Sequence, residues 1–248
     1  MGDYQLLAEV HDDYGVIRVV QAGDYRFLEF GDEVEQSCSY VPDPAWLEYD
    51  YTRAMLLGAL LPERTERALF LGLGGGNLTM ACLRHLPLAA VEAVELRPEV
   101  PRLAREFMGL AADPRLSTRV GDARDLLAEC APADLIYLDL YTDTGPASAH
   151  IAWGFLETCR ERLRPGGWLV INQWSATDGK PLGAALLRGL FRHCYWECPV
   201  TEGNVILYVP ADNDQVLDMQ RLRQRADELA GRVGYGFDAY LGALRAAS

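Results

Sequence analysis

The sequence predicts an α/β protein with a doubly wound, mostly parallel sheet of seven strands, preceded by a small antiparallel β-domain. Strand-like and helix-like segments alternate from residue 68 onward, which is the pattern of a parallel sheet covered by helices. One apolar strand, 68–71, runs directly into a glycine-rich turn and then into a helix. The first 47 residues instead hold short β-rich runs separated by turns, which favours a separate antiparallel unit.

The predicted domain boundary follows residue 47. It separates an N-terminal β-meander domain, 1–47, from a Rossmann-like domain, 48–248. The β-rich runs of the meander are 16–21, 25–30 and 34–39. The stretch 47–61 carries apolar residues at helical spacing and ends at Pro62, so it predicts a helix that leads into the larger domain.

The larger domain is predicted to contain five parallel strands and a closing hairpin, which together give seven strands. The strands are predicted at 68–71, 90–95, 116–120, 134–139 and 168–171, and the hairpin at 195–200 and 204–209. The helices are predicted at 78–86, 98–108, 123–130, 149–163, 180–192 and within 212–247. Helices between successive parallel strands cover both faces of the sheet, as a doubly wound fold requires.

The composition excludes several classes of function. The 248 residues carry a net charge of −13, which repels phosphate backbones, so we expect a small cationic partner and no nucleic acid. No apolar run approaches the length of a membrane span and the N-terminus lacks a signal-peptide pattern, so we expect a cytoplasmic protein without a membrane partner. Cys194 and Cys198 lie near His193, but buried thiols explain the six scattered cysteines better than a metal site, and we predict no metal.

The glycine-rich turn is the first candidate for ligand binding. Gly72, Gly74 and Gly76 stand at alternate positions between the apolar strand and the helix. Glycine permits left-handed backbone and lets N–H groups approach a ligand closely, and the helix N-terminus adds partial positive charge. The same spacing also occurs in tight strand-to-helix turns that bind nothing, so the loop alone does not establish a ligand.

Carboxylates end three further strands, at the edge where ligands bind in such sheets. Glu95 ends the second strand about twenty residues after the loop, where a carboxylate takes ribose hydroxyls or starts a helix. Asp122, followed by Ala123, ends the third strand, where it can accept from an adenine amino group or cap a helix. Asp139 ends the fourth strand and can act in catalysis or cap its loop. Together these positions favour adenosine as the ligand.

The motifs resemble class I S-adenosylmethionine-dependent transferases and, in finer detail, the divergent spermidine-synthase-like branch of the polyamine aminopropyltransferase family. The matching segments are Glu35-Gln36-Ser37, Tyr51 to Leu56, Gly72 to Gly76, Glu95, Gly121-Asp122-Ala123 and Asp139 to Ala147. The resemblance covers residues 14–209. Its most specific part is the spacing of Asp139 before Gly145-Pro146-Ala147.

The resemblance implies transfer of an aminopropyl group from decarboxylated S-adenosylmethionine to a small amine such as putrescine. We also expect a homodimer. It also implies that Gln36 contacts the nucleoside or the aminopropyl end of the donor. We expect Asp139 to hold the amine and to act as general base, because a carboxylate can pair with a cation and then accept its proton. Tyr51, Tyr141 and Asp143 are expected to line the amine channel, although helix packing also explains Tyr51.

Three positions depart from the pattern of the family. Gly75 stands where the family's loop has an aspartate, and Asp143 comes one place later than the second aspartate of the family's acidic loop, with Thr142 in its slot. Tyr51 comes one position earlier than the family's helix tyrosine. Two alternatives to aminopropyl transfer therefore stay open. They are a methyltransferase that uses S-adenosylmethionine itself and a catalytically degenerate nucleoside-binding homologue.

Overall fold

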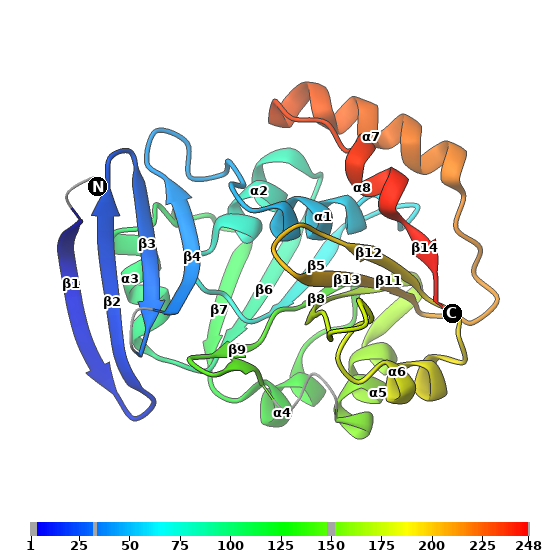
Figure 1. Cartoon of the computed structure of the whole chain (residues 1–248), viewed down its shortest axis with the longest axis horizontal. Coiled ribbons are helices and arrows are strands. Elements are labelled where there is room, and N and C mark those ends of the chain that lie inside the picture. The colour runs from blue at the N-terminus through cyan, green and yellow to red at the C-terminus, as the bar shows by residue number, and fades with distance from the viewer. Residues whose placement is uncertain (1–3, 32–33, 148–151, 248) are drawn as a thin grey trace.

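A computed structural model describes residues 4–31, 34–147 and 152–247 of the chain. It contains a large mixed sheet with helices on both faces and a small antiparallel sheet beside it (Figure 1). The predicted α/β fold is therefore confirmed. Asp32 and Glu33, which we predicted in a turn, and the start of the helix predicted at 149–163 lie outside the described residues. The division into domains at residue 47 stays a prediction.

The small sheet has four antiparallel strands in the order β1-β2-β3-β4. Their bounds are Gln5–Asp12, Gly15–Ala22, Tyr25–Phe30 and Val34–Tyr40. The three predicted runs correspond to β2, β3 and β4, whereas β1 was not predicted. Every side chain of β1 is exposed or half-buried, so the strand lacks the alternation of buried and exposed residues that identifies a strand from sequence.

The large sheet has eight strands in the order β14-β12-β13-β11-β8-β5-β6-β7. In chain order they are β5 Arg67–Leu71, β6 Ala90–Glu95, β7 Leu116–Val120, β8 Ala133–Leu138, β11 Leu163–Trp174, β12 Trp196–Pro199, β13 Asn204–Pro210 and β14 Arg245–Ala246. Seven of them are the predicted strands. The eighth is the two-residue β14, which pairs with β12. A separate ribbon, β9 Tyr141–Thr142 with β10 Gly145–Pro146, follows β8.

The order of the strands creates a switch point beside β5. From β5 the chain moves outward through β6 and β7, and it then returns to place β8 on the other side of β5. These strands and β11 are parallel, and β13 closes the sheet antiparallel to β11 and β12. The loops after β5 and β8 therefore leave the sheet in opposite directions, and a ligand site is expected between them.

Helices cover the large sheet in two layers. In chain order they are α1 Asp50–Gly58, α2 Asn77–His85, α3 Glu99–Glu106, α4 Ala123–Leu126, α5 Trp153–Glu161, α6 Ala184–Phe191, α7 Met219–Val233 and α8 Asp238–Ala243. In Figure 1, α1, α2, α7 and α8 lie above the sheet and α4, α5 and α6 lie below it. Neighbouring residues of a strand enter opposite cores, as Tyr137 and Ile136 of β8 do.

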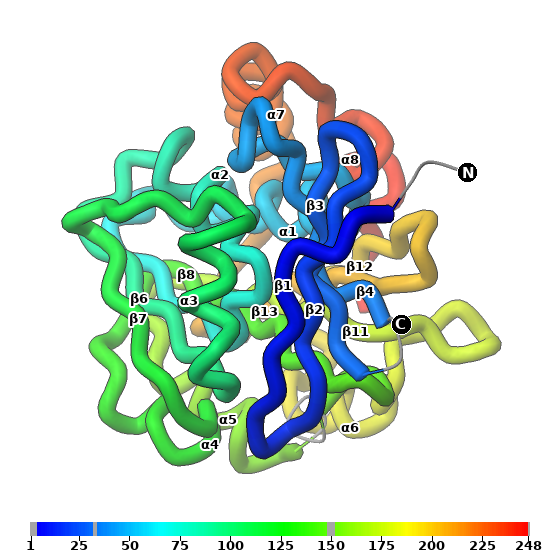
Figure 2. Tube along the Cα trace, turned by 90° about the vertical axis from the view of Figure 1, so that its left-hand side faces the viewer, coloured from blue at the N-terminus to red at the C-terminus, as the bar shows by residue number. Residues whose placement is uncertain are grey.

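The small sheet packs on α3 through an apolar contact. Ile17 and Leu28 of the small sheet belong to one buried cluster with Val100 and Leu103 of α3. Figure 2 shows β1 and β2 crossing the front of the molecule next to α3. The contact places one end of the small sheet near the carboxyl end of β6, from which α3 follows.

A buried ion pair joins the hairpin of β1 and β2 to the segment after β6. The Arg97 guanidinium donates to both carboxylate oxygens of Asp12, at 2.9 and 2.7 Å, and to the Gly15 carbonyl oxygen at 2.7 Å. It also lies over the Phe30 ring, 4.4 Å from the ring centroid. Both charged side chains are less than a tenth exposed. Removal of one partner would therefore leave the other charge buried without compensation.

Asp12→Ala is expected to lower the free energy of unfolding by about 3–5 kcal/mol, because it leaves the buried Arg97 charge unpaired. Asp13→Ala, at an exposed neighbouring position, should change this free energy by less than about 0.5 kcal/mol. Urea unfolding of both variants at pH 7 measures the difference. An equal effect of the two substitutions would show that the ion pair does not stabilise the fold.

Candidate active site

The glycine loop and the end of β8 touch through their backbones. Gly72 has a φ of +96°, and a Cβ added there would lie 2.1 Å from the carbonyl oxygen of Asp139. The Asp139 N–H donates to the Leu71 carbonyl at 2.9 Å, and the Gly72 N–H donates to the Val94 carbonyl at 2.9 Å. Only glycine fits this approach. It brings Asp139 next to the loop.

Glu95 holds the glycine loop with its carboxylate and is only 8% exposed. One oxygen accepts from the Leu73 N–H at 3.0 Å and the Gly74 N–H at 3.5 Å, and the other accepts from the Arg97 N–H at 3.0 Å. Burial raises the pKa of Glu95, and the three backbone donors act in the opposite direction. Gly76 ends the loop as the N-cap of α2. Because a carboxylate has about four acceptor sites, Glu95 retains capacity for a ribose hydroxyl.

The small sheet contacts the glycine loop through Ser37, not through Gln36. The Ser37 hydroxyl accepts from the Gly75 N–H at 2.9 Å. The register of β4 against β3 shifts at this point, so that Gln36 is an extra residue without a partner on β3. Its amide donates to the Val34 carbonyl of its own strand at 3.4 Å. The sequence motif includes Ser37 but predicted no role for it, and the contact expected between Gln36 and the donor stays a prediction.

Asp122 caps α4, which is the alternative that the sequence left open for it. Its carboxylate accepts from the Arg124 N–H at 2.8 Å and pairs with the Arg124 guanidinium at 2.6 Å. The hydrogen bonds from Arg124 lower the pKa of Asp122. Ala123 is buried in the first turn of α4. A contact of Asp122 or Ala123 with an adenine stays a prediction.

Two asparagines position the carboxylate of Asp139. The Asn204 amide donates to the side-chain oxygen of Asn172 at 2.8 Å, and the Asn172 amide donates to Asp139 at 2.8 Å. Burial raises the pKa of Asp139 to about 6, although the hydrogen bond from Asn172 lowers it. A carboxyl that titrates near neutral pH is suited to accept a proton from a substrate. Asn204 gives no sequence signal, because β13 brings it to Asn172 from the next strand of the sheet.

Tyr51 and Tyr141 lie near Asp139. Burial raises the pKa of both phenols, and the negative charge of Asp139 raises each pKa further. The Tyr141 hydroxyl donates to the Asn172 carbonyl at 3.3 Å. The Tyr51 ring stacks on Tyr49, with 5.7 Å between the centroids. The structure therefore brings both predicted tyrosines to the predicted base.

Asp143 lies against the small sheet. It is exposed in the turn between β9 and β10, and its Cβ lies 3.0 Å from the position of a Cβ added at Gly31 of the small sheet. The Thr142 hydroxyl donates to the Gly145 carbonyl at 3.1 Å across the ribbon. One oxygen of the Asp143 carboxylate lies 3.3 Å from the same position of an added Cβ at Gly31, so the side chain faces the small sheet. The place expected for Asp143 in the amine channel stays a prediction.

A cavity lies between Asp139, the glycine loop and the start of α1. Its walls include Glu48, Tyr49, Tyr51, Asn77 and Asp139. Sequence reasoning missed Glu48, which precedes α1, and Asn77, which follows the loop, because tertiary packing alone places them here. Two carboxylates and two phenol rings around one cavity suit a cationic ligand.

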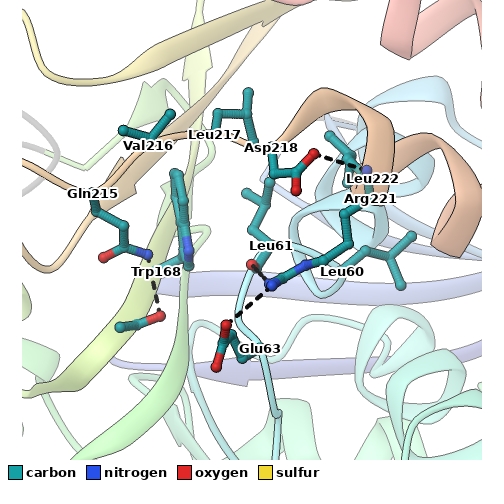
Figure 3. A pocket seen from close by; sticks show the side chains of 11 residues that line it. Leu60, Leu61, Glu63, Trp168, Gln215, Val216, Leu217, Asp218, Arg221 and Leu222 are labelled. Atoms are coloured by element: carbon teal, nitrogen blue, oxygen red, sulfur yellow. Dashed lines mark hydrogen bonds and ion pairs between the residues drawn. The ribbon is translucent and has the colours of Figure 1, made fainter.

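A larger pocket, of about 240 Å³, lies at the amino ends of the parallel strands (Figure 3). Leu60, Trp168 and Leu217 contribute apolar walls. Arg221 and Glu63 form an ion pair of 3.2 Å on one side of it. The strand-end carboxylates gather at the opposite edge of the sheet, where ligands bind in this fold. The smaller cavity beside Asp139 is therefore the candidate active site.

Within the described ranges, no three side chains of metal-ligating type come together. All six cysteines are free thiols, and Cys198, which we considered near His193 as a possible ligand, is buried with its thiol 3.5 Å from the Tyr240 carbonyl. No helix in the described part of the chain is long and apolar enough to cross a membrane.

Comparison with known proteins identifies the family. No family model matches the chain. The polyamine aminopropyltransferase of Chromobacterium violaceum is 30% identical over 232 residues, which cover 92% of this chain and 89% of that protein. The chain belongs to the polyamine aminopropyltransferase family. The resemblance found in the sequence motifs is thereby confirmed.

Solved structures share the fold of this aminopropyltransferase family member. A spermidine synthase in complex with the transition-state analogue AdoDATO superposes with a TM-score of 0.76 at 13% identity, and the match covers 96% of this chain and 84% of that one. Human methyltransferase-like protein 13 in complex with SAH superposes with a TM-score of 0.59 at 25% identity, over 80% of this chain and 92% of that one. Fold alone does not separate aminopropyl transfer from methyl transfer.

Gly72→Ala is expected to lower the free energy of unfolding by about 3 kcal/mol or more, because the new methyl group would collide with the Asp139 carbonyl in a left-handed backbone. Gly154→Ala is the matched control. It lies in α5 with open space around its Cβ, and it should stabilise the fold by up to about 1 kcal/mol. Urea unfolding compares the two. If both variants are as stable as the wild type, the close approach of loop and β8 is not required.

Asp139→Asn is expected to stabilise the fold at neutral pH. The pKa of Asp139 rises from 3.8 to about 6 on folding, so the folded state binds this proton more tightly than the unfolded chain. The contribution of Asp139 to the free energy of unfolding of the wild type therefore falls as pH rises from about 4 to 6. The asparagine variant lacks this fall. We expect the variant to gain about 1–3 kcal/mol at pH 7 and little at pH 3.5. Urea unfolding at both pH values tests this, and a gain independent of pH would contradict it.

Proposed function

We propose that the protein transfers an aminopropyl group from decarboxylated S-adenosylmethionine to a primary amine such as putrescine. The observation that carries this proposal is the Asp139 carboxylate, which has a raised pKa of about 6 and faces a cavity beside the glycine loop. Membership of the aminopropyltransferase family supports the reaction type. The net charge of −13 favours a cationic donor and a cationic acceptor.

The donor is proposed to bind with its adenosyl part against the glycine loop. Glu95 is the proposed partner of the ribose hydroxyls, since its carboxylate retains acceptor capacity beside the loop. Gly72, Gly74 and Gly76 present backbone without side chains, which permits a close approach of the nucleoside. Asp122 at the end of β7 is the proposed partner of the adenine.

The reaction requires a neutral amine. An alkylamine with a pKa of about 10.4 is protonated at pH 7, and release of its proton costs about 4–5 kcal/mol. Asp139 pairs with the ammonium, orients it and accepts the proton. The nitrogen lone pair then forms a bond to the methylene next to the sulfonium, the carbon–sulfur bond breaks, and its electron pair stays on sulfur. The products are a longer polyamine and 5′-methylthioadenosine.

Asn172 and Asn204 are proposed to orient the base. The Asn172 amide occupies one carboxylate oxygen of Asp139, which leaves the other oxygen for the amine. Asn204 donates to the side-chain oxygen of Asn172, so the amide of Asn172 must point its nitrogen at Asp139. Tyr51 and Tyr141 add aromatic walls beside the ammonium.

We also propose a homodimer that joins through the small sheet. Tyr4, Leu6, Tyr14 and Val34 in and around this sheet are 38% to 69% exposed, and a partner surface would cover their apolar side chains. The cytoplasmic location and the lack of a nucleic-acid partner stay predictions from the composition.

Methyl transfer from S-adenosylmethionine is the second candidate function. Gly75 places no carboxylate in the loop, so the loop does not repel the carboxylate of that donor. The similarity to human methyltransferase-like protein 13 over 80% of the chain also favours this candidate. The two donors differ by one carboxylate group, so the two functions are separated by their products.

Asp139→Asn is expected to reduce turnover by about 10²–10⁴-fold, because the variant cannot accept the proton of the amine. Asparagine still accepts the hydrogen bond from Asn172, so affinity for the donor should stay near that of the wild type. Mass spectrometry of products, with both donors and a panel of diamines and polyamines, measures turnover, and calorimetry measures binding. Asp13→Asn, at an exposed position, is the control.

Two results would overturn the proposal. Aminopropylated product from Asp139→Asn at the wild-type rate would show that Asp139 is not the base. Methylated product from the wild type, without aminopropylated product, would establish the second candidate function.

A further inference from the structure

We propose that Glu48 and Asn77 bind the primary ammonium group of the donor, and that Glu48 makes the protein select decarboxylated S-adenosylmethionine over S-adenosylmethionine. The inference rests on the proposed function. It assigns donor selectivity to two residues that lie outside the motifs recognised in the sequence.

The glycine loop has no room for a carboxylate of its own. A Cβ added at Gly75 would lie 2.8 Å from the side-chain oxygen of Asn77, 3.0 Å from the Cβ of Ser37 and 3.1 Å from the terminal methyl of Met108. The amide oxygen of Asn77 therefore occupies the space beside Gly75 that an acidic side chain would need. A negative charge for the donor must come from another element.

Asn77 presents an unpaired acceptor at this place. Its side-chain nitrogen donates to the Pro44 carbonyl at 3.0 Å, and because a carbonyl only accepts, this bond fixes which way the amide points. The Asn77 oxygen is then buried without a hydrogen-bond partner among the described residues, in a residue only 7% exposed that lines the cavity. A buried acceptor without a donor is unfavourable, and an ammonium N–H from a ligand would satisfy it.

Glu48 supplies the negative charge across the same cavity. The Trp46 indole N–H donates to it at 2.9 Å and the Tyr25 hydroxyl at 3.3 Å, and both bonds go to one carboxylate oxygen. The other oxygen is thus available. Within the described residues no ion pair includes Glu48. The neighbouring cation, Arg53, donates to the Leu47 carbonyl instead and lies over the Trp46 ring.

The negative charge of Glu48 acts on a side chain that lines the cavity. Cys38 also lines the cavity, and its thiol pKa is raised to about 12, chiefly by burial, with contributions from the charges of Glu35 and Glu48. A carboxylate and a neutral amide oxygen together fit a primary ammonium, which carries three N–H donors and one positive charge. The α-carboxylate of S-adenosylmethionine is attached next to its amine, so it would come close to Glu48 and be repelled. Decarboxylation removes that group and keeps the ammonium.

Calorimetry on Glu48→Gln tests the inference with three ligands. Glutamine still accepts from Trp46 and Tyr25 but carries no charge. We expect affinity for decarboxylated S-adenosylmethionine to fall by roughly ten- to a hundredfold. Affinity for S-adenosylmethionine should rise or stay unchanged. Affinity for 5′-methylthioadenosine, which has neither ammonium nor carboxylate, should stay within about twofold, and it reports that the nucleoside pocket is intact.

Two further variants complete the test. Asn77→Leu removes the acceptor, and it should weaken both amine-bearing donors by roughly tenfold without changing 5′-methylthioadenosine binding. Glu63→Gln makes the same chemical change at a remote, exposed carboxylate and should leave all three affinities unchanged. An unchanged ratio of the two donor affinities in Glu48→Gln, with 5′-methylthioadenosine bound normally, would overturn the inference alone. Failure of the wild type to bind 5′-methylthioadenosine would overturn the proposed function.

Discussion

The arrangement of the site depends on one buried carboxylate, that of Glu95. A charged group at this depth is tolerated only when hydrogen bonds satisfy it, and three backbone N–H groups do so. Two of these donors belong to Leu73 and Gly74, so the shape of the glycine loop is determined by the carboxylate at the end of the adjacent strand. The third belongs to Arg97, whose guanidinium binds Asp12 of the small sheet. The same carboxylate therefore links the loop, β6 and the attachment of the small sheet.

Asp139 differs from Glu95 in the number of donors that compensate its burial, although burial raises the pKa of both carboxyls. Among the described residues its carboxylate accepts one hydrogen bond, from Asn172, and burial raises its pKa to about 6. The difference follows from position, because β6 ends where the loop turns its N–H groups inward, whereas β8 ends at a cavity. A satisfied carboxylate contributes to structure. A buried carboxylate with too few hydrogen-bond donors lowers the stability of the ligand-free protein, and it gains a partner when a cation binds.

Local patterns predicted the fold well because the parallel strands are short apolar runs that end in glycine or acidic residues. Glu95 and Asp139 could be predicted as site residues for the same reason, since ligands bind at the carboxyl ends of the strands in a doubly wound sheet. Gln36 is a position where alternation along a strand gives no such guide, and its contact with the donor stays a prediction. It is the extra residue of an irregular strand, so period-two alternation does not tell which side chain faces the loop. The position of the Asp143 side chain depends on the path of the β9–β10 ribbon. The role proposed for Asn77 depends on its side-chain oxygen, which has no hydrogen-bond partner among the described residues. Neither feature leaves a pattern in the sequence.

The lack of an acid in the glycine loop has a structural consequence that extends beyond charge. Gly75 lets Ser37 of the small sheet and Met108, which follows α3, approach the loop closely, and any larger residue there would push them away. The small sheet thus forms part of the wall of the cavity that we propose to bind the donor. The ion pair of Arg97 with Asp12 attaches the small sheet to the segment after Glu95. We therefore expect a change that weakens this attachment to make the glycine loop less ordered as well. Donor binding and attachment of the small sheet are therefore expected to be coupled, since a ligand that orders the loop stabilises the contact that holds the sheet.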